Sequence, residues 1–242
     1  MKLHIICTLL LTILQFTIHA QVQLGTDIDG EATYNDSGTS VSVSSDGNRV
    51  AIGAPRNGGN EPGLGQVRIY EWSGSNWIQL GADIDGEAEV DQSGYSVSIS
   101  SDGNRVAIGA PLNNGNGTNS GHVRIYEWSG GVWSQLGVDI NGEAFDDESG
   151  YSLSISSDGN RVAIGAQYNN GNGINSGHVR IYEWTGSSWI QMGADIDGEA
   201  EGDHSGCSVS ISSDGSRVAI GAYRNDGNGI NSGHVRIYEW SG

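Results

Sequence analysis

Carboxylates gather in two short stretches of this 242-residue sequence. Each stretch contains five acids within nine residues, and four of them in each stretch are candidate cation ligands. The eight candidate ligands are Asp83, Asp85, Glu87, Asp91, Asp195, Asp197, Glu199 and Asp203. Carboxylate oxygens are the ligands that Ca²⁺ prefers, and a divalent cation relieves the repulsion between close negative charges. We therefore predict weak Ca²⁺ sites at these residues; the alternative is a solvated acidic surface that maintains solubility.

The acidic stretch recurs in two further, less complete copies. They comprise Asp139, Glu143 and Asp147, with Asn141 in place of one acid, and Asp27, Asp29 and Glu31, with Asn35 in the fourth place. Residues 27–35, 83–91, 139–147 and 195–203 are called the acidic segments below. Their spacing differs from that of an EF-hand loop.

The histidines invite a metal or catalytic interpretation, which we weigh against a structural one. His122, His178 and His234 occupy one repeat position, and Gln66 replaces them in the first copy. Equivalent residues of a ring point the same way and lie far apart. We therefore expect a hydrogen-bonded side chain at a strand start. His204, beside Asp203, is expected to be exposed.

No catalytic motif occurs in the sequence. There is no Gly-x-Ser-x-Gly elbow, phosphate loop, dinucleotide fingerprint or His-Glu-x-x-His. An enzyme also needs an asymmetric group of acids and bases, whereas almost every residue here is repeated. We predict no catalytic residues and no cofactor other than Ca²⁺.

A 56-residue repeat must position these residues. Gln79-Leu80-Gly81 recurs at residues 23, 135 and 191, with methionine replacing leucine in the last copy. The repeats cover approximately residues 23–78, 79–134, 135–190 and 191–242. Because the copies are nearly identical and no linker separates them, we expect one domain, residues 21–242.

Each repeat contains four strand candidates. In the second repeat they are residues 95–100, 105–110, 122–128 and 133–136, the first of them a strict alternation of polar and apolar side chains. Asp102-Gly103 predicts a type I′ turn between the first two. Residues 113–121, rich in asparagine and glycine, predict a loop between the second and third. Residues 57–65, 113–121, 169–177 and 225–233 are called the Asn/Gly loops.

Four short antiparallel strands per repeat are typical of a β-propeller blade. A single blade cannot bury both faces, so the blades must stack. We predict an all-β propeller of four blades, or a fragment of a larger ring, with an open β-solenoid as the alternative. The mature chain is expected to start with fourth-strand residues 21–24 and to end after third-strand residues 235–240, so the N-terminal strand is expected to complete the last blade. In this arrangement the acidic segments and the Asn/Gly loops share one face.

Periodic arginines and tryptophans predict structural roles. Arg105 and its equivalents are expected to form ion pairs with the repeated glutamates such as Glu127. An exposed ion pair of this kind contributes little to stability. Trp128 and its equivalents are expected to pack in the core or at a blade edge; a platform for carbohydrate stacking is the alternative.

Residues 93–111, followed by 121–128, resemble the FG-GAP repeat, the blade of the integrin alpha-chain propeller. Ser93-Gly94-Tyr95 stands at the Phe-Gly position, and Gly109-Ala110-Pro111 matches Gly-Ala-Pro. The resemblance implies a propeller in a secreted or surface protein. Calcium-binding members carry several acids in the first hairpin, but this hairpin has only Asp102. The family's calcium site is therefore not carried over to Asp46, Asp102, Asp158 or Asp214, which we expect to cap tight turns.

The first twenty residues have the layout of a secretory signal peptide: Lys2, an apolar run and a small residue at Ala20. The mature chain is expected to be secreted, extracellular or at the cell surface, with no membrane insertion after cleavage. Its one cysteine, Cys207, cannot form an internal disulfide. The formal net charge of −18 disfavours nucleic-acid binding, which needs a basic surface.

These observations predict a secreted, non-enzymatic binding or adhesion protein. It would present an acidic, loop-rich face to a protein or glycan ligand with the assistance of calcium, and we expect a monomer. The first alternative is a structural spacer in a matrix, favoured by the near identity of the copies. The second is a glycan-active enzyme on a propeller scaffold.

Overall fold

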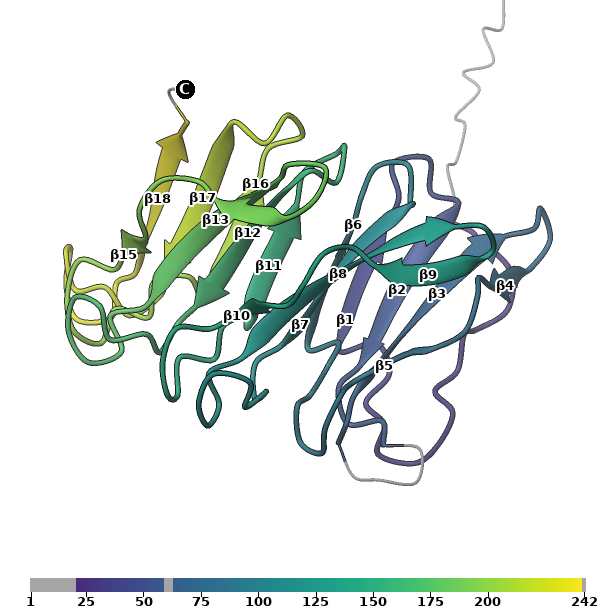
Figure 1. Cartoon of the computed structure of the whole chain (residues 1–242), viewed down its shortest axis with the longest axis horizontal. Coiled ribbons are helices and arrows are strands. Elements are labelled where there is room, and N and C mark those ends of the chain that lie inside the picture. Colours follow the sequence, from purple (N-terminus) through teal and green to yellow (C-terminus); the bar gives the residue numbers. More distant parts are fainter. Residues whose placement is uncertain (1–20, 59–62, 241–242) are drawn as a thin grey trace, which may run out of the picture.

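The computed structural model describes residues 21–58 and 63–240 of the chain. The regular elements within these ranges are all strands, in four antiparallel sheets (Figure 1). No helix in the described part of the chain has the length and apolar character needed to cross a membrane. The predicted signal peptide, residues 1–20, lies outside the described residues.

Each sheet corresponds to one repeat, and the sheets are called blades 1 to 4. Blade 1 contains β1 (Ser40–Val43), β2 (Arg49–Ala54), β3 (Gln66–Trp72), β4 (Trp77–Gln79) and β5 (Ile84–Asp85). Blade 2 contains β6 (Ser96–Ile99), β7 (Arg105–Ala110), β8 (His122–Ser129), β9 (Val132–Gln135) and β10 (Ile140–Asn141). Blade 3 contains β11 (Ser152–Ile155), β12 (Arg161–Ala166), β13 (His178–Trp184), β14 (Trp189–Gln191) and β15 (Ile196–Asp197). Blade 4 contains β16 (Ser208–Ile211), β17 (Arg217–Ala222) and β18 (His234–Glu239).

The four strands predicted for each repeat are confirmed in blades 1 to 3, with two local differences. Residues 140–141 form an additional short strand, β10, along β8, where the buried Ile140 pairs with Val123. The predicted type I′ turn is wrong, since only Gly103 of the Asp102-Gly103 pair has a positive φ. The Asp102 side chain instead closes this turn by accepting hydrogen bonds from Ser100 Oγ and the Asn104 N–H.

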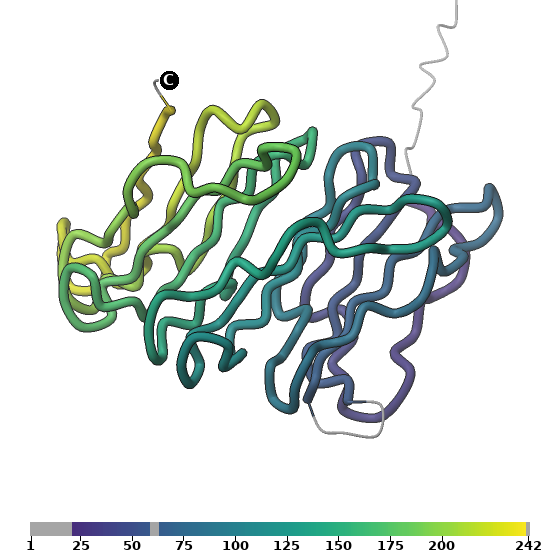
Figure 2. Tube along the Cα trace, viewed as in Figure 1, coloured from purple at the N-terminus to yellow at the C-terminus, as the bar shows by residue number. Residues whose placement is uncertain are grey.

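The blades stack through their innermost strands. β1 packs against β6, β6 against β11, and β11 against β16. Ser96 Oγ of β6 donates a hydrogen bond of 2.7 Å to the Gly150 carbonyl, which lies just before β11. The equivalent serines of β1 and β11 donate to Gly94 and Gly206 in the same way. Figures 1 and 2 show the resulting row of blades, in sequence order from one end to the other.

Apolar side chains fill the space between neighbouring blades. Val97 and Ile99 of β6 belong to one buried cluster with Val67 and Ile69 of β3. Ile125 of β8 belongs to a second cluster, which it shares with Leu153 and other side chains of blade 3. Each apolar face is therefore buried by the next copy of the repeat, as expected for blades that cannot bury both faces alone.

The expected closure by the N-terminal strand is not formed. Among the described residues, blade 4 has three strands, and residues 21–24 form no strand with it. The Leu24 carbonyl instead accepts a hydrogen bond of 3.0 Å from Trp77 Nε1 of blade 1, just as the Leu80 carbonyl accepts one from Trp133. Blades 1 and 4 lie at opposite ends of the row (Figure 1).

The predicted pairs of arginine and glutamate are confirmed, and they do more than pair on the surface. Arg105 Nη2 lies 2.8 Å from Glu127 Oε1, while Nη1 donates to Asn160 Oδ1 of blade 3. Each such arginine of blades 1 to 3 thus also contacts the next blade. The tryptophans pack in pairs, with 5.3 Å between the ring centroids of Trp128 and Trp133.

Candidate functional site

The acidic segments and the Asn/Gly loops share one face of the row, as predicted. Asn116 Nδ2, in the Asn/Gly loop of blade 2, donates a hydrogen bond of 2.9 Å to the Gly142 carbonyl in the next acidic segment. Asn172 makes the same contact with Gly198 one repeat later. This face carries most of the differences between blades and all the predicted metal ligands.

Two of the predicted calcium ligands, Asp91 and Asp203, already accept two hydrogen bonds each. Asp91 is fully buried, and its Oδ2 accepts hydrogen bonds from the Ala88 N–H and from Asn113 Nδ2. Asp203 Oδ2 accepts the equivalent two bonds, from the Ala200 N–H and Asn225 Nδ2. These two carboxylates hold an acidic segment to an Asn/Gly loop.

The other predicted ligands have separate partners. Asp83 Oδ1 and Asp195 Oδ1 accept hydrogen bonds of 2.6 and 2.7 Å from glutamines of the preceding strands. Asp85 Oδ1 accepts one of 3.3 Å from Gln66 Nε2. Burial, followed by the charge of Asp195, raises the pKa of Asp197.

The structure brings metal-ligating side chains together in a different combination from the predicted one. Within the described ranges, two groups have ligand atoms close enough to hold a metal ion: Glu87 with His122 and Asp139, and Glu143 with His178 and Asp195. Each contains one member of the predicted set, Glu87 or Asp195. In blade 4, Glu199 Oε2 lies 3.5 Å from His234 Nδ1. Calcium binding by the predicted residues stays a prediction.

The sequence predicts a hydrogen-bonded histidine at the start of β8, and among the described residues the Nδ1 atom of this histidine has no such bond. His122 is 1% exposed, and its Nδ1 has no hydrogen-bond partner in the described part of the chain. Burial, with a smaller contribution from the charge of Arg124, lowers the pKa of His122 to about 4. The imidazole is therefore neutral at neutral pH.

The aspartates of the first hairpins cap tight turns, as predicted. Asp46 accepts hydrogen bonds from Ser44 Oγ and from the backbone and side chain of Asn48, and these bonds lower its pKa to about 2. Such a carboxylate is fully engaged in its own turn.

A second group of side chains lies at the inner end of the blades, on the same face. We call it the rim cluster; it comprises Tyr95, Glu148, Tyr151, Tyr168, His204 and Tyr223. The rings of Tyr95 and Tyr151 are 5.0 Å apart, and that of His204 lies 5.1 Å from Tyr168 and 5.5 Å from Tyr223. These residues come just before an inner strand or just after its neighbour, so stacking of the blades brings them together.

Several positions of the rim cluster differ between the four nearly identical repeats. The position of Glu148 is occupied by Asp36, Gln92 and His204 in the other repeats. That of Tyr168 is occupied by Arg56, Leu112 and Arg224. In blade 1 these two positions form an ion pair of 3.2 Å between Arg56 and Asp36. The sequence contained this signal, but it required comparison of the copies position by position together with the strand order.

His204 is buried, not exposed as expected. Its ring packs between Tyr168 and Tyr223, and burial followed by the charge of Arg224 lowers its pKa. The expectation failed because the neighbouring tyrosines come from the ends of β12 and β17, which are distant in sequence.

Glu148 is predicted to make stability fall as the pH rises. Burial, followed by the charge of Asp146, raises the pKa of Glu148 from 4.5 to about 7. The unfolded chain loses this proton near its ordinary pKa, whereas the folded chain keeps it up to about pH 7, so deprotonation favours the unfolded state between these values. Glu148→Gln cannot ionise and should match the parent at the acidic end but melt at a higher temperature at pH 8.

Melting temperatures of the two proteins across this pH range check the prediction. Glutamine stands at the equivalent position 92, so the variant is expected to fold. A difference in melting temperature that stays constant with pH would show that Glu148 titrates normally.

The stacked blades define the chain as a β-propeller-like repeat protein. Residues 83–126 and 195–238 match the family model of the FG-GAP repeat, in agreement with the resemblance noted in the sequence. Comparison with curated proteins gives no match.

Among solved structures, hydrazine synthase of Kuenenia stuttgartiensis is similar over 90% of this chain, with a TM-score of 0.53 and 13% sequence identity. The match spans 49% of the length of that chain. At this identity the likeness concerns the fold alone.

Proposed function

We propose that this chain is a secreted, non-enzymatic binding protein whose rim cluster contacts a protein ligand. The observation that carries the proposal is that the rim cluster brings together, from three blades, several positions at which the repeats differ and fills them with tyrosines and a histidine.

The composition of the rim cluster supports a protein ligand. Tyrosine and arginine are enriched among the residues that dominate binding energy in protein interfaces. Tyr223 is exposed, Arg224 lies 5.3 Å from its ring centroid, and Tyr95, Tyr151 and Tyr168 are partly exposed. The surrounding acidic segments would add long-range attraction for a basic partner. Secretion is supported by the signal-like residues 1–20 and by the FG-GAP repeats.

A variant that restores the repeat tests this proposal. Glu148→Gln, Tyr168→Leu and His204→Gln together place the residues of blade 2 into blades 3 and 4, so each new residue already occurs at its position elsewhere. The control is Ile190→Ser, which places the blade 2 residue Ser134 on the outer strand β14.

Binding is measured on arrays of purified extracellular proteins and of glycans. We expect the parent and the control to bind a protein with saturation, and the triple variant to bind at least about tenfold more weakly, a loss of about 1.4 kcal/mol. Equal binding by parent and triple variant would place the interface elsewhere. Saturable binding to glycans alone would overturn the proposal in favour of a glycan ligand. No saturable binding to any probe would overturn it in favour of the spacer alternative.

A further inference from the structure

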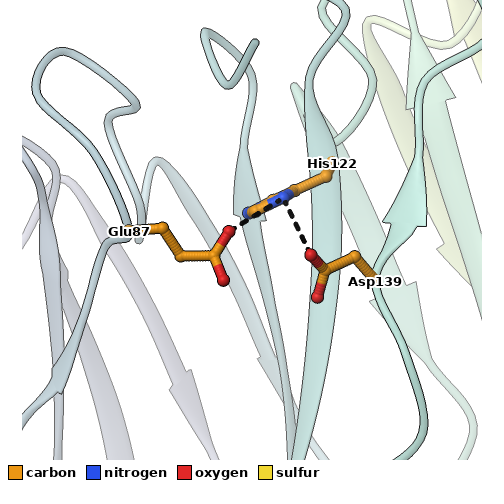
Figure 3. A group of neighbouring side chains, drawn as sticks. All are labelled: Glu87, His122 and Asp139. Carbon is orange, nitrogen blue, oxygen red and sulfur yellow. Dashed lines mark ion pairs between the residues drawn. The ribbon is translucent and has the colours of Figure 1, made fainter. Parts of the chain in front are cut away.

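Three side chains meet where blade 2 joins its two connecting segments. His122 is the first residue of β8, Glu87 follows β5 of blade 1, and Asp139 directly precedes β10. His122 Nδ1 lies 4.0 Å from Glu87 Oε2 and 3.9 Å from Asp139 Oδ2. Figure 3 shows the two carboxylates facing the imidazole from opposite sides. The pairing of β10 with β8 fixes the position of Asp139 relative to the ring.

The same arrangement occurs again one repeat later. His178 Nδ1 lies 3.7 Å from Glu143 Oε2 and 3.9 Å from Asp195 Oδ2. In both groups the three ligand atoms lie within 4.8 Å of one another. Separate sets of connecting segments thus give one geometry twice.

Blade 1 shows how this position is satisfied without a histidine. Gln66 stands there, and its Oε1 accepts a hydrogen bond of 2.7 Å from Asn57 Nδ2 while its Nε2 donates to Asp85 Oδ1. The amide therefore supplies donors and acceptors that the loops can use directly.

The imidazole of blade 2 is not satisfied in this way. His122 Nδ1 is buried without a hydrogen-bond partner among the described residues. The carboxylates lie beyond the range of about 2.7–3.2 Å for an N–H···O bond. A buried polar atom left in this state costs free energy. A cation between the three groups would accept the nitrogen lone pair and neutralise the carboxylates.

We propose that Glu87, His122 and Asp139, and likewise Glu143, His178 and Asp195, form two transition-metal sites of the kind that binds Zn²⁺. One imidazole nitrogen and two carboxylate oxygens suit this ion, whereas Ca²⁺ takes six to eight oxygen ligands. Tetrahedral Zn²⁺ places its ligand atoms about 3.4 Å apart. The distances from the imidazole nitrogen to the two carboxylates therefore need to close by about 0.5 Å, and the distance between the two carboxylate oxygens, which is within 4.8 Å, by up to about 1.4 Å. A water molecule would complete the coordination.

Neighbouring groups already orient the ligands. Arg124 Nη1 lies 3.3 Å from Glu87 Oε1, which leaves Oε2 facing the imidazole. Arg180 makes the same contact with Glu143 at 3.6 Å. Partners of this kind hold a ligating carboxylate in place at a metal site. A metal ion here would tie the segment before a blade to the segment after it, and its role is independent of the rim cluster.

The experiment counts metal ions in the parent, His122→Gln, His178→Gln and the double variant. Glutamine is the residue of blade 1, so these variants are expected to fold, and their melting temperatures without metal check this. His234→Gln is the matched control, because a single carboxylate faces that histidine in the described part of the chain. Zn²⁺ binding is measured by titration calorimetry, and Co²⁺ absorption reports tetrahedral nitrogen and oxygen coordination.

We expect two equivalents of Zn²⁺ in the parent and in His234→Gln, one in each single variant, and none in the double variant. Zn²⁺ should raise the melting temperature of the parent but not that of the double variant. Absence of binding by the parent, unchanged stoichiometry in the double variant, or displacement of Zn²⁺ by an equal concentration of Ca²⁺ would each overturn the proposal.

Discussion

Ile125→Ala should lower the free energy of unfolding by about 2–5 kcal/mol, the usual loss when a buried isoleucine is truncated. Ile125 lies on β8, is 1% exposed, and belongs to the buried cluster between blades 2 and 3. Truncation removes apolar contacts on both sides of this boundary and leaves a cavity that the stacked sheets cannot close.

The chain provides a matched control for this substitution. Ile237 occupies the same repeat position on β18 but is 72% exposed. Ile237→Ala is expected to change the free energy of unfolding by no more than about 0.5 kcal/mol. Urea unfolding of the parent and both variants measures the difference. The comparison holds when the slope of the free energy of unfolding against urea concentration is the same in all three proteins. Equal losses in the two variants would show that packing between blades contributes little to stability.

Local sequence patterns were sufficient to predict the strands. The alternation at residues 95–100 and the glycine-rich turns depend on neighbouring residues, and their strands lie where expected. The repeat length then predicted one sheet per copy, and the placement of two kinds of loop on one face followed from the strand order. Each of these features is determined within a single repeat.

Features that depend on several repeats could not be predicted in the same way. Residues 21–24 carry a fourth-strand pattern, which fits either end of the array, and only the contact of Leu24 with Trp77 decides between them. The acids of one segment are close in sequence, yet the structure combines Glu87 with a histidine and an aspartate from later segments. The path of two connecting segments, after β5 and before β10, past the start of β8 determines which carboxylates lie close together.

The rim cluster illustrates the same limit. Glu148, Tyr168 and His204 have no motif in common, and each is unremarkable within its own repeat. Their relation emerges only when the inner strands are stacked, because each blade contributes one or two side chains to a shared surface. Near identity of the repeats therefore supplies the scaffold, while a few substitutions give it asymmetry.

Gly109→Ala should also destabilise the protein strongly, through contact between blades. A Cβ at this position would collide with the Gly150 carbonyl of the next blade and with Ser96 Oγ of its own. Gly109 lies in β7 without a positive φ, so alanine meets no backbone strain and the collision is the cause. The Gly150 carbonyl also accepts the hydrogen bond of Ser96 Oγ. Displacing this carbonyl from β7 therefore disturbs the contact that joins β6 to β11.

Gly221→Ala separates the contact between blades from the contact within one blade. Gly221 is the equivalent residue of β17, where the Cβ would meet Ser208 Oγ and Cys207 Sγ of its own blade but no carbonyl of a following one. Gly109→Ala is therefore expected to cost about 1–3 kcal/mol more than Gly221→Ala, the typical penalty of overpacking. Chemical unfolding measures both, and equal costs would mean that the serine contact alone requires glycine. The close approach that glycine permits would then serve the single blade, and the stack would depend on its apolar clusters instead.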